Sequence, residues 1–222
     1  MIRAVIFDLD DTLFPESEYA LSGFRAVGVW IEKKHSIHGF FPIAEEFFRK
    51  GKRGNIFNLA LYELGIQYAE ALVPEMVKVY REHRPDITLF EDARWALNYF
   101  KPNRKCGVVT DGYLVTQKNK IRALNIEDCF DIIIYSDEFG REHWKPSETP
   151  YRKVMESLSC SGNECVYIAD NPVKDFVTAK ALGWLTVHIR RPSGEYSHHI
   201  PVMGYEADKE ITSLFELKEL IE

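Results

Sequence analysis

The sequence predicts an α/β protein with a doubly wound, Rossmann-like parallel sheet, and two observations support this fold class. Short apolar runs rich in β-branched residues recur along the chain, at 4–7, 106–110, 131–135, 165–169 and 185–189. Segments whose apolar residues repeat at helical spacing lie between these runs. Strands that alternate with helices form parallel sheets with right-handed crossovers, since each helix returns the chain to the same end of the sheet.

Each run is short, continuous and bounded by polar residues, Gly or Pro, as expected of a strand that is buried on both faces. We expect helices around 97–100, at 118–124, at 151–158 and at 173–182, the last one ending at Gly183 as a helix stop would. The tail, ITSLFELKELIE, predicts a short last strand and a closing helix.

The interval between the first two strands is too long for a simple crossover. Roughly ninety residues separate them, whereas a crossover needs only about a dozen. The interval reads as helical: apolar residues recur from Ala20 to Ile31, around 47–48 and at 56–64, and Pro74 opens a further segment that ends near 84–85. We therefore predict a core at 1–14 and 87–222, and a small helical cap at 15–86 over the strand ends.

Composition excludes several classes of protein. The 28 basic and 34 acidic residues give a net charge of −6, which argues against a general affinity for nucleic acid or an anionic membrane. The apolar run near the N-terminus is too short for a signal peptide or a membrane span, so a cytoplasmic protein is expected. The four cysteines lack CxxC spacing and are expected to be buried free thiols.

The polar residues that follow the strands indicate a functional site. In an open parallel sheet, ligands bind beyond the carboxyl ends of the strands. The first run ends in Asp8 and Asp10, the second in Thr110, Asp111 and Gly112, and the fourth in Asp170 with Asp175 close behind; Lys145 follows the third. These strand ends together offer several carboxylates, a hydroxyl group, backbone N–H groups and one ammonium group.

The stretch AVIFDLDDTLF at 4–14 places three aspartates within four positions, and crowded carboxylates repel one another. Carboxylates that converge without His or Cys suit a hard cation, and Mg²⁺ binds through one or two carboxylates plus a substrate phosphate. A divalent cation together with Lys145 would offset the repulsion and keep Asp8 ionised. Asp11, which strand alternation turns away from Asp10, is expected to cap a helix or to lie in a flap.

With these residues in place, the chain resembles the haloacid dehalogenase (HAD) superfamily. Four motifs occur in the family's order: DxDxT within VIFDLDDTL, a strand ending in threonine in VVT at 108–110, a lysine in HWKPSETPY, and an acidic pair in YIADNPVKD. The predicted helical insert corresponds to the family's cap between its first and second motifs. Ala169 stands where the family most often has glycine, and Glu148 replaces its usual proline.

The resemblance implies a Mg²⁺-dependent phosphomonoesterase that acts on a small phosphorylated metabolite through an aspartyl-phosphate. Asp8 would be the nucleophile and Asp10 the general acid and base. Thr110, the N–H groups of Asp111 and Gly112, and Lys145 would hold the phosphoryl group. Asp8, Asp170 and the backbone carbonyl of Asp10 would ligate the metal, with Asp175 in its second coordination shell.

Three other functions remain open beside the phosphatase. A phosphomutase would retain all four motifs, and a catalytically idle binding module would keep the sheet for partner recognition. A phosphonatase is also possible, whereas Asp10 argues against a dehalogenase, since a departing halide needs no proton. Sugar phosphates, phosphoglycolate and nucleotides are all admissible substrates.

Overall fold

The computed structural model describes residues 1–67 and 69–221, and within them it contains one parallel sheet of six strands. The strands are β1 (Ala4–Phe7), β2 (Lys105–Thr110), β3 (Ile132–Tyr135), β4 (Cys165–Ala169), β5 (Leu185–Ile189) and β6 (Lys209–Ile211). They lie in the order β3-β2-β1-β4-β5-β6, and every neighbouring pair is parallel. The predicted doubly wound sheet is confirmed. Its order reverses between β1 and β4, where sheets of this kind bind ligands.

The chain divides into two compact units. One comprises Met1–Glu16 and Thr88–Glu222 and contains the sheet, and the other comprises Ser17–Ile87. Cap function for the second unit stays a prediction.

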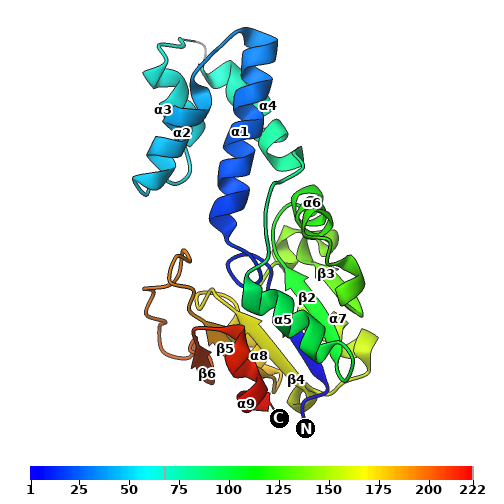
Figure 1. Cartoon of the computed structure of the whole chain (residues 1–222). Helices are drawn as coiled ribbons and strands as arrows, with labels where there is room; N and C mark the ends of the chain where they lie inside the picture. The colour runs from blue at the N-terminus through cyan, green and yellow to red at the C-terminus, as the bar shows by residue number, and fades with distance from the viewer. Residues whose placement is uncertain (68, 222) are drawn as a thin grey trace. The chain divides into compact units, whose positions relative to one another are not determined.

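Helices cover both faces of the sheet in the first unit (Figure 1). They are α5 (Glu91–Phe100), α6 (Leu114–Leu124), α7 (Thr149–Leu158), α8 (Phe176–Ala181) and α9 (Leu217–Ile221). The described part of this unit also contains five short 3₁₀ turns: η1 (Glu127–Cys129), η2 (Ser136–Phe139), η3 (Arg141–His143), η4 (Gly162–Glu164) and η5 (Leu214–Glu216). Tyr151 of α7 and Phe176 of α8 pack with Ile6 and Tyr167 in one buried cluster. Strand side chains alternate between faces, so the equally buried Phe7 points to the opposite face. α5 and α9 lie in front of the strands in Figure 1.

Several helices begin elsewhere than the sequence pattern predicts, among them α6 at Leu114 instead of 118 and α7 at Thr149 instead of 151. α8 begins at Phe176 instead of 173, because Asn171 holds the preceding residues in a turn: its side-chain oxygen accepts from the Val173 N–H at 3.0 Å. α4 begins at Ala69 and contains Pro74 instead of starting there. A proline removes one helical hydrogen bond, and this helix tolerates that loss.

The second unit is built from four helices among its described residues: α1 (Glu16–His35), α2 (Phe40–Arg49), α3 (Ile56–Glu63) and α4 (Ala69–Glu82). They share one apolar core, which contains Phe24, Ile31, Phe40, Leu61 and Met76. This core is separate from the cluster under the sheet, as expected of a unit with its own fold. None of the helices that the structure describes is long and apolar enough to cross a membrane.

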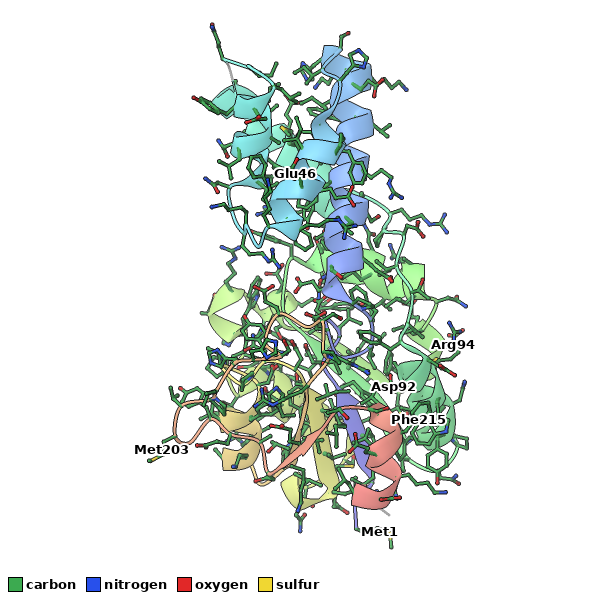
Figure 2. The ribbon with its side chains drawn as sticks, turned by 60° about the vertical axis from the view of Figure 1, so that its left-hand side comes forward. Met1, Glu46, Asp92, Arg94, Met203 and Phe215 are labelled. Carbon is green, nitrogen blue, oxygen red and sulfur yellow. The ribbon has the colours of Figure 1, made fainter. Side chains whose placement is uncertain are left out.

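A buried ion pair ties α5 to the chain that follows β1. Asp92 of α5 binds Arg191 through two contacts of 2.6 and 2.9 Å, and it also accepts from the backbone N–H of Leu214 at 2.8 Å. Figure 2 shows Asp92 near the C-terminal segment that carries Phe215. Arg191 in turn donates to the carbonyl of Thr12 at 2.8 Å. This pair therefore holds the loop that follows Asp8 in place.

Candidate active site

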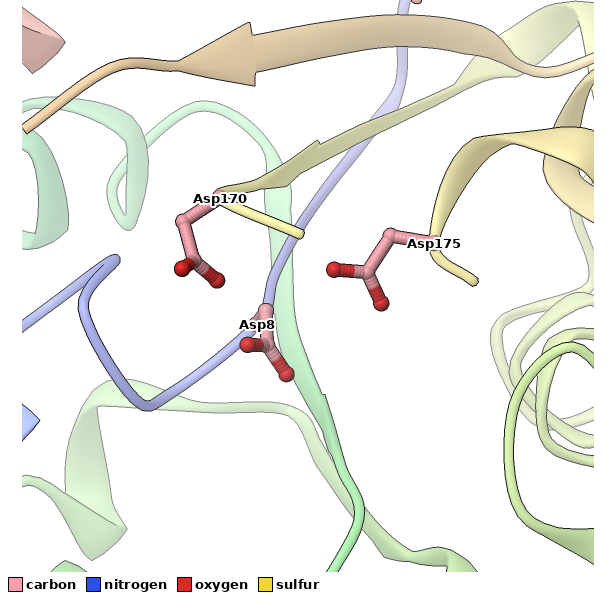
Figure 3. A group of neighbouring side chains, drawn as sticks. All are labelled: Asp8, Asp170 and Asp175. Atoms are coloured by element: carbon pink, nitrogen blue, oxygen red, sulfur yellow. The ribbon is translucent and has the colours of Figure 1, made fainter. Parts of the chain in front are cut away.

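Three carboxylates from separate segments converge at the carboxyl end of the sheet. Asp8 follows β1 and Asp170 follows the neighbouring β4, in a register that pairs Phe7 with Ile168. Asp175 is the residue immediately before α8. One oxygen of each carboxylate lies within 4.8 Å of the others, and Figure 3 shows the three groups pointing toward one another. Asp8 and Asp170 are 7% exposed and Asp175 is fully buried.

Lys145 is the cation that contacts this cluster of carboxylates. Its side chain is completely buried, and its Nζ lies 2.6 Å from Asp8 Oδ1 and 2.8 Å from Asp175 Oδ1. The same ammonium donates to the hydroxyl of Tyr167 on β4 at 2.9 Å. Burial alone would lower the pKa of Lys145, but the charges of Asp175 and Asp8 outweigh it and raise that pKa well above the usual value. Lys145 is therefore charged at neutral pH.

One ammonium does not neutralise three carboxylates. Burial raises the pKa of Asp8 to about 7, although Lys145 opposes this rise. Burial, followed by the charges of Asp8 and Asp175, raises the pKa of Asp170 well above its usual range. Both shifts arise first from burial, and the negative charge of the neighbouring carboxylates adds to them. The three carboxylates and Lys145 sum to a charge of −2, which a divalent cation would neutralise.

The donor set also fits such a cation. All three side chains offer carboxylate oxygens, the ligand type that Mg²⁺, Mn²⁺ and Ca²⁺ prefer. This group contains Asp175, whose carboxylate the sequence interpretation places in the second shell, and it does not contain the Asp10 carboxylate.

We expect the thermal unfolding midpoint of the metal-free protein to fall as the pH rises from about 5 to about 8. Asp8 has a folded-state pKa near 7, above its unfolded value of 3.8, so the folded state binds more protons across this interval. The stability that Asp8 contributes is complete below its unfolded pKa and is lost as the pH passes its folded pKa. Asp92 and Asp111, whose pKa values are lowered, act in the opposite direction in more acidic solution. His188, whose pKa burial lowers from 6.5, opposes part of the trend at the acidic end of the interval.

Circular dichroism melts in chelator and in saturating Mg²⁺ measure this dependence. Mg²⁺ should flatten it, because the cation favours ionised carboxylates. Asp170→Asn should also flatten it and should remove the response to Mg²⁺. A metal-free midpoint that stays constant or rises over this interval would contradict the assignment of uncompensated charge to this cluster.

Three of the four predicted phosphate-binding residues lie at the end of β2, and the fourth is Lys145. Thr110 is its last residue and is 1% exposed. Both carboxylate oxygens of Asp111 have partners within the protein. Oδ1 accepts from the backbone N–H of Lys145 at 3.1 Å, and Oδ2 pairs with Lys174 at 2.7 Å. Gly112 has a φ of +122°, a conformation that favours glycine. Asp111 thus ties the end of β2 to the segment that carries Lys145.

The two other aspartates of the first motif have separate surroundings. The Asp10 carboxylate lies 2.6 Å from Lys120 Nζ and accepts from Gln117 at 2.9 Å. Asp11 has a φ of +49°, and its carboxylate accepts from the backbone N–H of Glu16, where α1 begins, at 2.8 Å. It also accepts from the N–H of Glu195 at 3.0 Å.

Sequence reasoning missed four residues of this site: Gln117, Lys120, Tyr167 and Lys174. Gln117 and Lys120 are three apart on α6, and this spacing places them on one face of the helix. That spacing, directly after the second motif, is the one signal that the sequence offers. Tyr167 reads as an ordinary strand residue and Lys174 as an ordinary loop lysine.

Comparison with known proteins agrees with this geometry. The family model of haloacid dehalogenase-like hydrolases matches residues 5–189. Glyceraldehyde 3-phosphate phosphatase of Methanopyrus kandleri is 29% identical over 243 residues, with 99% of both chains covered. Pyrophosphatase PpaX of Bacillus cereus is 26% identical over 182 residues, which cover 77% of this chain and 75% of the relative.

Solved structures share the fold. A HAD phosphatase from Thermococcus onnurineus is similar with a TM-score of 0.65 at 23% identity, over 99% of this chain and 98% of that one. A HAD-hydrolase from Bacillus subtilis bound to magnesium has a TM-score of 0.70 at 19% identity, over 100% and 99%. The match to the family model spans all four motifs and both units. The chain therefore belongs to the haloacid dehalogenase-like hydrolase family.

Proposed function

We propose that this protein is a Mg²⁺-dependent phosphomonoesterase that acts on a small phosphorylated metabolite through an aspartyl-phosphate. The observation that carries the proposal is the convergence of Asp8, Asp170, Asp175 and Lys145 on one buried point at the carboxyl end of the sheet. Relatives named as phosphatases support the same reaction class.

Asp8 is the nucleophile in this proposal. One of its oxygens attacks phosphorus, the bond from phosphorus to the ester oxygen breaks, and Asp10 gives a proton to the departing alkoxide. Asp10 then takes a proton from the water that attacks the aspartyl-phosphate. Inorganic phosphate leaves and the carboxylate of Asp8 is regenerated.

The other groups around Asp8 would bind the metal ion, hold the phosphoryl group and orient the nucleophile. Asp8, Asp170 and Asp175 would hold Mg²⁺, together with the backbone carbonyl of Asp10. When bound, the ion supplies positive charge opposite the phosphoryl oxygens. Thr110 and the N–H groups of Asp111 and Gly112 are proposed to hold those oxygens. Lys145 would orient Asp8 for attack and, together with the ion, would favour its ionised form.

Ser17–Ile87 is the proposed cap and source of substrate specificity, because the sheet edge recognises only the phosphoryl group. Two archaeal relatives, from Methanopyrus kandleri and Methanocaldococcus jannaschii, carry the name of glyceraldehyde 3-phosphate phosphatase. Both are matched over nearly their whole length, so we favour a short phosphorylated sugar or acid as the substrate. The cytoplasm remains our proposed location. The four cysteines, Cys106, Cys129, Cys160 and Cys165, are free thiols, as a reducing compartment would keep them.

Release of inorganic phosphate tests this function. We expect the protein to hydrolyse glyceraldehyde 3-phosphate or another short phosphate ester, and also p-nitrophenyl phosphate, with Mg²⁺ present. Chelator should abolish release, and added Mg²⁺ should restore it. Activity that persists in chelator would contradict the proposed dependence on Mg²⁺.

Two other outcomes would replace the phosphatase. Conversion of a sugar phosphate to an isomer without phosphate release, detected by ³¹P NMR, would identify a phosphomutase. No turnover of any ester across a broad metabolite panel would favour a binding module.

A further inference from the structure

The face of α6 that carries Gln117 and Lys120 has no function in the reaction described so far. Both side chains are buried, Gln117 at 1% and Lys120 at 3% exposure. A buried lysine is costly unless a partner compensates its charge. The Asp10 carboxylate provides that compensation here: Lys120 Nζ lies 2.6 Å from its Oδ1.

Gln117 engages the other oxygen of the same carboxylate. Its Nε2 donates to Asp10 Oδ2 at 2.9 Å and also to the hydroxyl oxygen of Thr110. An amide nitrogen has two hydrogens, so it can serve both acceptors. The two oxygens of Asp10 are thus fixed from one helix face, and the amide links them to the predicted phosphate-binding hydroxyl. The Asp10 side chain still keeps 21% of its surface exposed, which leaves it accessible to a reacting group.

We propose that Lys120 and Gln117 are positioning residues that aim the Asp10 carboxyl group, which carries a proton in the step that expels the alkoxide, at the leaving oxygen of the ester. This inference rests on the proposed phosphatase function and goes beyond it, because it assigns the orientation of the general acid to α6. Proton transfer requires the donor within hydrogen-bond reach of the accepting oxygen, and a carboxylate that rotates away loses that contact. Two donors on two oxygens restrict this rotation.

A comparison of two phosphate esters can test whether Lys120 and Gln117 position Asp10. kcat/KM for a reaction with a covalent intermediate reports the steps up to departure of the leaving group. An alkoxide leaves only with a proton from Asp10, whereas p-nitrophenolate leaves as a stable anion. Loss of positioning therefore lowers kcat/KM for an alkyl phosphate much more than for p-nitrophenyl phosphate. A purely structural defect lowers both equally.

We expect Lys120→Met to lower kcat/KM for glycerol 3-phosphate by about 100-fold and for p-nitrophenyl phosphate by less than about fivefold. Lys120→Gln, which keeps a donor on the same helix, should show the same ester preference with an alkyl loss of about tenfold. Lys118→Met is the matched control. Lys118 lies on the same helix, pairs with Glu138 at 3.1 Å and is 37% exposed, so kcat/KM for both esters should not change.

The double variant Asp10→Asn, Lys120→Met separates action through Asp10 from other effects. If Lys120 acts only on Asp10, its removal should change kcat/KM by less than about twofold once Asp10 is replaced. An equal loss on both esters, no loss on either, or a full further loss in the Asp10→Asn background overturns the inference. Wild-type protein that hydrolyses no ester of a broad panel, these two included, overturns the proposed function itself, and this inference with it. Should Lys120→Met fail to fold, the ester comparison with Lys120→Gln decides.

Discussion

Asp8→Asn should lower phosphate release by about 10⁴-fold or more, because an amide cannot attack phosphorus or carry the phosphoryl group. The substitution preserves the shape of the side chain. It also removes a buried carboxylate whose pKa burial raises to about 7, so the variant should be at least as stable as the wild type in chelator near pH 8. Loss of activity combined with retained or increased stability would show that Asp8 acts in the reaction and not in folding.

Initial rates on p-nitrophenyl phosphate and circular dichroism melts measure the two quantities. Asp128→Asn is the matched control, since Asp128 is an exposed aspartate of the short turn before β3 and lies outside the carboxylate cluster. Its activity should equal that of the wild type. An Asp8→Asn protein that keeps more than about a tenth of the wild-type rate would exclude Asp8 as the nucleophile.

Lys145→Met should destabilise the metal-free protein by about 3–5 kcal/mol near pH 8, because removal of one member of a buried ion pair leaves the other charge uncompensated. Here the remaining charges are Asp8 and Asp175, which lie 2.6 and 2.8 Å from the ammonium. For a protein of this size the unfolding midpoint should fall by roughly 10 °C. Phosphate release should fall as well, since the ammonium no longer orients Asp8.

Mg²⁺ gives this prediction a second readout. The variant cluster carries one more uncompensated negative charge, so saturating Mg²⁺ should raise its midpoint by more than it raises that of the wild type. Lys153→Met removes a surface lysine that pairs with Glu156 and should cost less than about 1 kcal/mol. If the two lysine variants lose equal stability, Lys145 does not compensate buried charge.

The sheet and the residues at its edge could be predicted because each depends on a short stretch of chain. A buried parallel strand is one continuous apolar run, and the next polar residue marks its carboxyl end. Asp8 and Asp170 are 162 positions apart. Parallel pairing alone places both at the same edge, on neighbouring strands β1 and β4.

The local apolar pattern did not predict the start of a helix where side-chain contacts determine the path of the backbone. The turn closed by Asn171 delays α8 to Phe176, although the apolar spacing predicts a helix from 173. Pro74 lies within α4 instead of at its start, because packing of the second unit outweighs the local preference of proline.

The sequence by itself determined the parallel sheet, its helical insert and the order of the charged residues along its edge, since these follow from local apolar periodicity and from the parallel direction of the strands. Only the tertiary structure decided which donors surround each carboxylate: Lys145, whose ammonium also donates to Tyr167, lies against Asp8, and Lys120 with Gln117 lies against Asp10. The physical reason is that such contacts depend on how each helix is rotated and packed against the sheet. That rotation is set by the whole core and leaves no local signal in the chain.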